Sequence, residues 1–329
     1  MSEKELKELN EILGECIEYD DFYIDGFMVL KRINDFLLKY YQEPVIDQTY
    51  IHRVDINTSY KLAYDFLYTI NPNYASYLKE TWEDGRFIIS DREMIEGIMV
   101  QNATSIFYEK TNSRKILMHE HNNIVDAFSI VHELVHDVYL KDMEEGNETF
   151  HFFCEAIAFT SEFLFEDYLR EKGLFLSDIG KNKKQMFSAI NYKAFQVGFE
   201  HFLLSEYYKN SSINNLTIYS YLKGKPKHFK IYAEFVIDGI LYTKQIGIDN
   251  EARNIIGIAF ASYMHQRILD KPLRVNELIY INENFDNMDL QDIFKYLDLK
   301  IEDIETDDLT TDSYRKIFKF YKKEIKTLR

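Results

Sequence analysis

A His-Glu-x-x-His segment, His132 to His136, constrains this chain more than any other feature of its 329 residues. On a helix the two histidines lie on one face about one turn apart, so both imidazoles can bind a single Zn²⁺. Apolar residues recur at helical spacing through the segment, and Asn122 and Asn123 precede it as candidate helix caps. The sequence therefore predicts an amphipathic helix over residues 123–140 that carries part of a metal site.

A catalytic zinc ion takes three protein ligands and leaves one position for water, so a third ligand must come from a neighbouring element. A second helix is predicted over residues 148–172, and two helices joined by a short turn pack antiparallel. Glu155 on this helix has apolar neighbours, so its carboxylate needs a charge partner. A solvated surface charge is the alternative. We expect one Zn²⁺ per chain, bound by His132, His136 and Glu155.

With these motifs the chain resembles the thimet oligopeptidase and oligoendopeptidase F family of zinc metallopeptidases. The resemblance rests on the His-Glu-x-x-His motif and on further segments that look similar to the family's: Ser59 to Leu78, Lys115 to Phe128, Glu155 to Glu162, the small-residue helix Asn254 to Tyr263, and Asp289 to Leu328. It spans about Ser59 to the C-terminus and covers only the catalytic half of the family. It implies a zincin-like (gluzincin) catalytic domain and a zinc-dependent endopeptidase or oligopeptidase, a hydrolase acting on peptide substrates.

The resemblance also implies roles for individual residues. Glu133 would be the general base that takes a proton from the zinc-activated water. Glu162 and Asp137 are candidates for holding a ligand imidazole through its second N–H, with an ordinary surface salt bridge as the alternative. An edge strand before the zinc helix would pair with the substrate, unless this stretch is an irregular loop; its predicted residues are Ile116, Leu117, Met118 and His119.

Departures from the family pattern leave two other functions open. Val135 stands where the family usually has glycine, and Asn250 to Arg253 replaces a Tyr-rich loop that stabilises the developing oxyanion. A catalytically silent zinc protein with a binding or regulatory role is one alternative. A sensor protease with a single protein substrate is the other, although no basic helix-turn-helix is visible. Candidate oxyanion donors, each with a packing role as its alternative, are Tyr232, Tyr242, Tyr263, His228 and Arg253.

Composition limits the classes of binding partner and the cellular compartment that we expect for this protein. The formal net charge of −16 argues against nucleic acid, whose phosphates require a basic face. No apolar run approaches the ~20 residues that cross a membrane, and the first residues lack the layout of a signal peptide. Only Cys16 and Cys154 occur, which excludes a disulfide framework. We expect a cytoplasmic protein with no nucleic-acid or membrane partner.

The predicted fold class is mainly α with a small β-sheet (α+β). Residues 1–57 are predicted to form an N-terminal helical extension and residues 58–329 the catalytic domain. Full-length relatives carry a longer N-terminal lobe, so we expect a more open cleft or one completed by a partner, such as a homo-oligomer. Helices are predicted near 3–18, 25–42, 58–80, 91–103, 123–140, 148–172, 186–208, 251–268, 289–297 and 312–328, and strands at 87–89, 105–108, 115–118 and, as a hairpin, 228–246.

Overall fold

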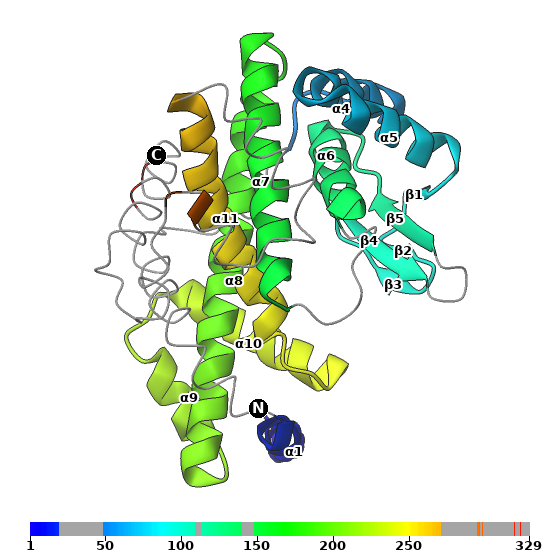
Figure 1. Ribbon diagram of the computed structural model, residues 1–329. Helices are drawn as coiled ribbons and strands as arrows, with labels where there is room; N and C mark the ends of the chain where they lie inside the picture. Colours follow the sequence, from blue (N-terminus) through cyan, green and yellow to red (C-terminus); the bar gives the residue numbers. More distant parts are fainter. Residues whose placement is uncertain are drawn as a thin grey trace. The chain divides into compact units, whose positions relative to one another are not determined.

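A computed structural model describes residues 1–19, 49–108, 113–139 and 148–270, together with residues 295, 296, 298, 319 and 323. This part of the chain is mainly helical with a small mixed sheet, which confirms the predicted fold class (Figure 1). It divides into two compact units. Among the described residues, the first unit comprises 1–19 and 186–256, and the second comprises 49–185 and continues from Gly257.

The second unit is built on a three-stranded sheet with the order β1-β5-β4. Strand β1 (Phe87–Ser90) is parallel to β5 (Ser113–His119), whereas β4 (Ala103–Tyr108) is antiparallel to it. Two short strands, β2 (Met94–Ile95) and β3 (Ile98–Met99), form a separate antiparallel hairpin. The predicted strands at 87–89, 105–108 and 115–118 are therefore confirmed.

Strand β5 is buried on both faces because successive side chains point to opposite sides of a sheet. Ile116 and Met118 pack into the helical core, whereas Leu117 packs on the other face against Ile95 and Val100 near the hairpin. A strand covered on both sides reads as a continuous apolar run, as this one does.

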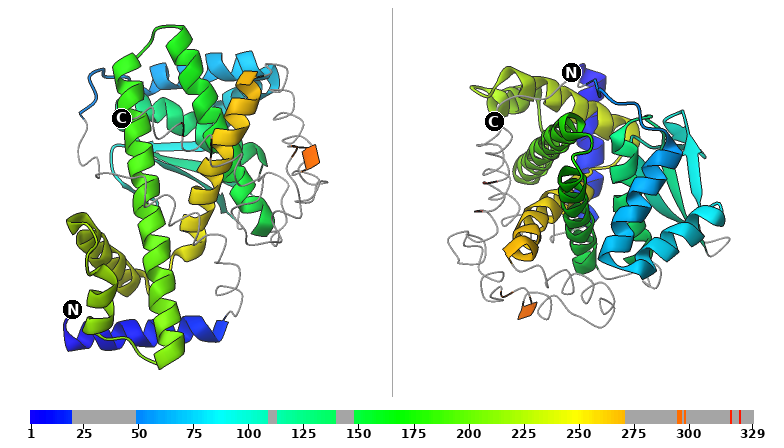
Figure 2. Two further views of the ribbon diagram at one scale, coloured as in Figure 1. Left: turned by 90° about the vertical axis from the view of Figure 1, so that its left-hand side faces the viewer. Right: turned by 90° about the horizontal axis from the view of Figure 1, so that it is seen from above.

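Helix α6 (Ile124–Tyr139) packs on this sheet, and three further helices pack with α6 or with one another in the same unit: α4 (Ile56–Ile70), α5 (Pro72–Glu83) and α7 (Glu148–Glu171) (Figures 1 and 2). The predicted helix over 58–80 is broken in two at Asn71, where Pro72 disfavours helical backbone in the preceding residue. Asn71 instead caps α5 by accepting a hydrogen bond from the Asn73 N–H at 3.0 Å.

The first unit has its own apolar core. Helices α1 (Glu3–Tyr19), α9 (Asn215–Leu222) and α10 (Lys227–Thr243) pack in it against α8 (Leu176–Asn210), and the start of α11 (Ile248–Asp270) belongs to the same unit. Leu9 and Leu13 of α1 are fully buried beside Phe195 and Phe199 of α8. The division of the chain at residue 57 stays a prediction, and the structure adds that α1 shares a core with α8 to α10.

Two element predictions are wrong. Residues 91–103 form the β2–β3 hairpin instead of a helix, since Glu96 (φ 51°) and Gly97 (φ 85°) adopt the positive φ angles of a two-residue hairpin turn. Residues 228–246 form helix α10 instead of a hairpin. Its buried side chains recur every three or four residues, a helical period that outweighed the Asp-Gly turn signal; they are Phe229, Tyr232, Ala233, Val236, Ile237 and Ile240.

Other predicted helices are present in the structure but begin or end at different residues. Helix α8 begins at Leu176, ten residues before the predicted start. In its first turn, the fully buried carboxylate of Asp178 accepts hydrogen bonds from the N–H groups of Ile51 and His52 at 2.8 and 2.9 Å. The predicted helices at 25–42, 289–297 and 312–328 lie largely outside the described residues. Within the described part, no helix is both long enough and apolar enough to cross a membrane.

Asp126 makes the stability of the second unit depend on pH. It is fully buried, and burial raises its pKa to about 6 even though backbone N–H groups of the preceding loop lower it. An acid with a raised pKa in the folded state stabilises the fold while protonated, and this contribution is lost as the pH rises through about 6. We expect the free energy of unfolding of the wild type to fall by about 1 kcal/mol more between pH 5 and 7 than that of Asp126→Asn.

Urea unfolding at both pH values, with a chelator present, measures this difference. Asp91→Asn removes an exposed carboxylate from the same unit and should follow the wild type. Equal pH dependence in Asp126→Asn and the wild type would contradict the assignment.

Candidate metal centre

Helix α6 places the two histidines of the motif on one face. Its start is fixed by Asn123, whose side-chain oxygen accepts a hydrogen bond from the Val125 N–H at 2.8 Å. Its apolar residues are buried in the helical core, which sets the rotation of the helix about its axis. The rings of His132 and His136 then lie side by side, with centroids 4.7 Å apart. The predicted helix and its cap are both confirmed.

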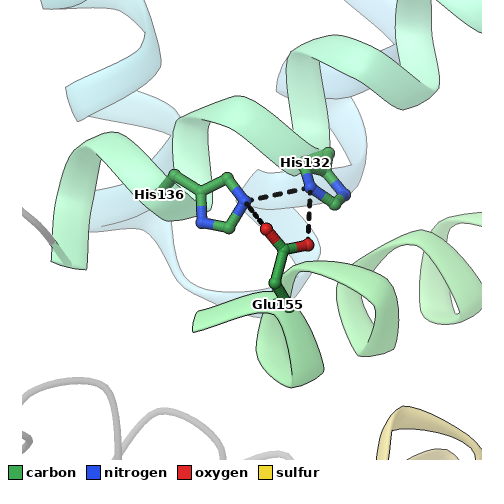
Figure 3. Close-up of side chains that lie close together, drawn as sticks. All are labelled: His132, His136 and Glu155. Atoms are coloured by element: carbon green, nitrogen blue, oxygen red, sulfur yellow. Dashed lines mark hydrogen bonds and ion pairs between the residues drawn. The ribbon is translucent and has the colours of Figure 1, made fainter. Parts of the chain in front are cut away.

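Glu155 on α7 points at this pair (Figure 3). Its carboxylate oxygens lie 3.6 Å from His132 Nε2 and 3.5 Å from His136 Nε2. The two Nε2 atoms are 3.0 Å apart, and the candidate ligand atoms all lie within 4.8 Å of one another. The structure thus brings together the three residues that the sequence predicts as ligands, and they form a group that could hold a metal ion.

The donor set fits Zn²⁺. Two nitrogens each about 2.05 Å from a tetrahedral zinc ion lie roughly 3.3 Å apart, close to the separation of the two imidazoles. Glu155 Oε2 is buried and has no hydrogen-bond partner, which is costly for a carboxylate unless a cation binds there. A His/His/Glu set is also the ligand type that zinc takes in hydrolytic sites with an open position.

The electrostatics of the cluster depend on its two imidazoles. Burial acts to raise the pKa of Glu155, but His136 and His132 hold it well below its usual range. For His132 burial acts to lower the pKa, whereas its contacts with Glu155 and Glu162 hold it well above the usual range. A metal ion must therefore displace a proton from His132, because only a neutral imidazole can bind it.

Glu162 has the contact predicted for it. His132 Nδ1 and Glu162 Oε1 are 2.6 Å apart, two helical turns beyond Glu155 on α7. In the neutral imidazole, a carboxylate at Nδ1 keeps the proton on that nitrogen, so that the lone pair is on Nε2, which faces the cluster. This contact fixes the orientation of the His132 ring, which agrees with the position predicted for Glu162.

Glu133 lies next to His132 on α6 and is 8% exposed. Burial raises its pKa, although His136, His132 and the backbone N–H of Ser105 on β4 lower it. A buried carboxylate with a raised pKa, next to the candidate ligands, suits a group that takes up a proton more readily than a solvated glutamate does.

Asp137 anchors α6 and its described hydrogen bonds do not reach an imidazole. Its buried Oδ2 accepts from the Tyr77 hydroxyl at 2.7 Å and from Arg86 Nη1 at 2.8 Å. Arg86 also donates to Thr81 Oγ1 at 2.6 Å. These contacts tie the C-terminal part of α6 to α5 and to the residue before β1. The predicted role of Asp137 in orienting a ligand receives no support, and the sequence held no signal that Arg86 or Tyr77 is its partner.

The predicted substrate edge strand is wrong in its position within the sheet. Ile116, Leu117, Met118 and His119 do form a strand, but this strand, β5, is paired with β1 on one side and β4 on the other. Its backbone groups are already used in these two ladders. Among the described strands, β4 is the sheet edge nearest to Glu133, through the N–H of Ser105.

The candidate oxyanion donors have varied settings, and their role stays a prediction. Four belong to the first unit: Tyr232 is buried in its core, His228 stacks edge-on against Phe229, Tyr242 is 88% exposed, and the side chain of Arg253 lies outside the described residues. Tyr263 is the fifth and lies in the second unit. Its ring is 4% exposed, and its hydroxyl accepts from Arg267 Nη1 at 3.3 Å.

Comparison with known proteins agrees with this fold. No protein-family model and no curated protein sequence matches the chain. PZ peptidase A, solved with an inhibitor, has a similar structure, with a TM-score of 0.59 and 12% identity over 94% of this chain and 58% of that one. A protein provisionally named oligoendopeptidase F from Bacillus anthracis str. Ames gives a TM-score of 0.51 and 10% identity over 98% of this chain and 56% of that one.

A third structure, provisionally named a peptidase, comes from Chlamydophila abortus. It gives a TM-score of 0.50 and 15% identity over all of this chain and 55% of the other. The chain thus spans little more than half the length of these three proteins. The fold implied by the family resemblance is confirmed: the described residues have the fold of solved peptidases of this kind.

Loss of the Glu162 carboxylate should weaken metal binding without abolishing it. We expect Glu162→Gln to lower zinc affinity about 10- to 100-fold, because the His132 ring loses the charged partner that fixes its tautomer. Competition with a chromophoric chelator measures the affinity. Glu171→Gln, which changes an exposed glutamate on the same helix, should bind zinc like the wild type. A wild-type affinity in Glu162→Gln would show that the contact is not functional.

Removal of Arg86 should destabilise the second unit. Arg86→Met leaves Asp137 buried without its cation, and we expect the free energy of unfolding to fall by about 3 kcal/mol. Adding Asp137→Asn removes the unpaired charge and should restore part of this loss. Urea unfolding of both variants in the presence of a chelator tests the pair, and identical midpoints for the wild type and Arg86→Met would disprove it.

Proposed function

We propose that the protein is a zinc-dependent peptidase that hydrolyses peptide bonds. The observation that carries this proposal is the convergence of His132, His136 and Glu155 beside the buried Glu133, within a fold shared with solved peptidases. A site that only stabilised the fold would have no use for a buried base next to its ligands. Glu133 is therefore the residue that distinguishes a hydrolytic site from a structural one.

In this proposal, different residues of the chain have different roles in hydrolysis. Zinc, when bound by the three ligands, would acidify a water molecule and polarise the carbonyl of the scissile bond. Glu133 accepts the proton at its carboxylate, and the raised pKa of this group favours holding it. The same carboxylate then passes the proton to the leaving amine. Glu162 keeps His132 in the tautomer that binds the metal ion throughout.

A peptide substrate would bind along β4. Among the described strands, β4 is paired on one side only and contacts Glu133 through the N–H of Ser105. An extended peptide that adds to such an edge is held by its main chain, with little dependence on side-chain identity. The substrate role that the sequence assigned to β5 is therefore transferred to β4 in this proposal.

A catalytically silent zinc-binding protein is the second candidate. It is favoured by the burial of Tyr263, the candidate oxyanion donor of the second unit, which is only 4% exposed. Loss of one oxyanion donor in a hydrolase costs roughly 3–4 kcal/mol of transition-state stabilisation. The presence of Glu133 in a buried position beside the ligands weighs against this alternative.

The proposal is tested by incubating the zinc-loaded protein with a mixed library of unstructured peptides and identifying new termini by mass spectrometry. We expect cleavage by the wild type and a loss of at least about 1,000-fold in Glu133→Gln, which keeps the shape of the side chain but cannot take a proton. Glu171→Gln serves as a control for the loss of one carboxylate.

Cleavage that persists in Glu133→Gln would rule out Glu133 as the base. An inactive wild type that binds one equivalent of zinc would favour the silent zinc-binding protein instead.

A further inference from the structure

Helix α11 approaches the backbone of α7 unusually closely at the third ligand. A Cβ atom added to Gly257 would lie 2.5 Å from Glu155 Cβ, 3.1 Å from the Glu155 carbonyl carbon and 3.2 Å from the Ala156 nitrogen. All three contacts are to backbone or to the first side-chain atom, so no side-chain rotation can relieve them. Only displacement of one helix from the other makes room for a side chain at position 257.

Glycine in a helix interior needs a packing reason, because it is the weakest helix former after proline. Gly257 is buried within α11, and Ile258, Ala259, Ala261 and Ser262 after it are buried as well. Gly239 in the interior of α10 shows the contrast, since a Cβ added there would meet nothing within 4 Å. A Cβ added to Gly14 or Gly247 would meet only side-chain atoms of Tyr207, Gln196 or Glu200, whereas one added to Gly257 would meet the backbone of another helix.

We propose that Gly257 is a positioning residue for the metal ligand Glu155. A metal site tolerates ligand displacements of only about 0.2 Å, whereas ordinary van der Waals contact begins at 3.4 Å, roughly an ångström beyond the 2.5 Å that a side chain would impose. The absence of a side chain at 257 lets α11 support the α7 backbone at the residue whose carboxylate must reach both imidazoles. This inference rests on the metal-binding part of the proposed function.

The first test is the zinc affinity of Gly257→Ala, measured by chelator competition. We expect it to be weakened about 10- to 100-fold, the range found when residues that support metal ligands are changed. Gly239→Ala is the matched control and should bind zinc like the wild type. The visible spectrum of the Co²⁺-loaded Gly257→Ala protein should shift toward that of Glu155→Gln, because both changes alter the same ligand.

A double-variant cycle decides whether the effect passes through Glu155. In a Glu155→Gln background, Gly257→Ala should cause no further loss of affinity, since the ligand it positions is already gone. Equal losses in both backgrounds would assign the effect to general destabilisation and overturn the proposal. Wild-type affinity in Gly257→Ala would overturn it directly.

The proposal can still be tested if the Gly257→Ala variant does not fold. If Gly257→Ala is unfolded, the added change Glu155→Gly removes the shortest contact, at 2.5 Å, and leaves only the backbone contacts at 3.1 and 3.2 Å, so it should restore at least part of the folded population. Failure of this rescue would place the clash elsewhere and overturn the proposal. A wild type that binds no zinc would instead defeat the proposed function itself, so the two failures are distinguishable.

Discussion

The contact between α6 and α7 is the interaction on which the site depends. Helix α6 contributes His132 and His136 from one face, and α7 contributes Glu155 and Glu162 from positions two turns apart. Each helix alone presents only two of these four groups. Their burial is tolerable only when the helices meet, because each imidazole then has a carboxylate and each carboxylate an imidazole.

Among the described residues of this cluster, carboxylates outnumber imidazoles. Three largely buried carboxylates, those of Glu133, Glu155 and Glu162, surround two imidazoles. Without a metal ion, a proton on His132 compensates part of the negative charge, which agrees with the direction of its pKa. A divalent cation supplies more compensation at the same place. Proton and metal are therefore competitors for one position, and the apolar shell around the cluster makes that position attractive to either.

Local patterns in the sequence were sufficient to predict the candidate metal ligands. They were not sufficient to predict the order of the strands next to them. The spacing of His132 and His136 and the apolar context of Glu155 were sufficient because helical periodicity fixes which residues share a face. The order of strands was not predictable in the same way: β5 is a central strand, and alternation along one strand carries no information about its neighbours. The prediction of a hairpin at 228–246 is wrong because the helical spacing of six apolar residues determines the structure there, and a single Asp-Gly pair does not override it.

The contacts of Asp137 and Gly257 lay beyond sequence reasoning for a different reason. Arg86 is 51 positions from Asp137, and Gly257 is about a hundred from Glu155, so neither pairing leaves a trace in local periodicity. Both depend on how helices are packed in space, which is settled by the shapes of many side chains together.

The anchoring of α6 at both ends has a consequence for the geometry of the metal site. Asn123 fixes the first turn, and Asp137 joins the last turns to Arg86 and Tyr77. These contacts at both ends of α6 hold the two histidines in a fixed position relative to each other, with their Nε2 atoms 3.0 Å apart. Glu155 lies on a separate helix, α7, so any change in the packing of α7 against α6 would move the carboxylate relative to two nitrogens that keep their own spacing.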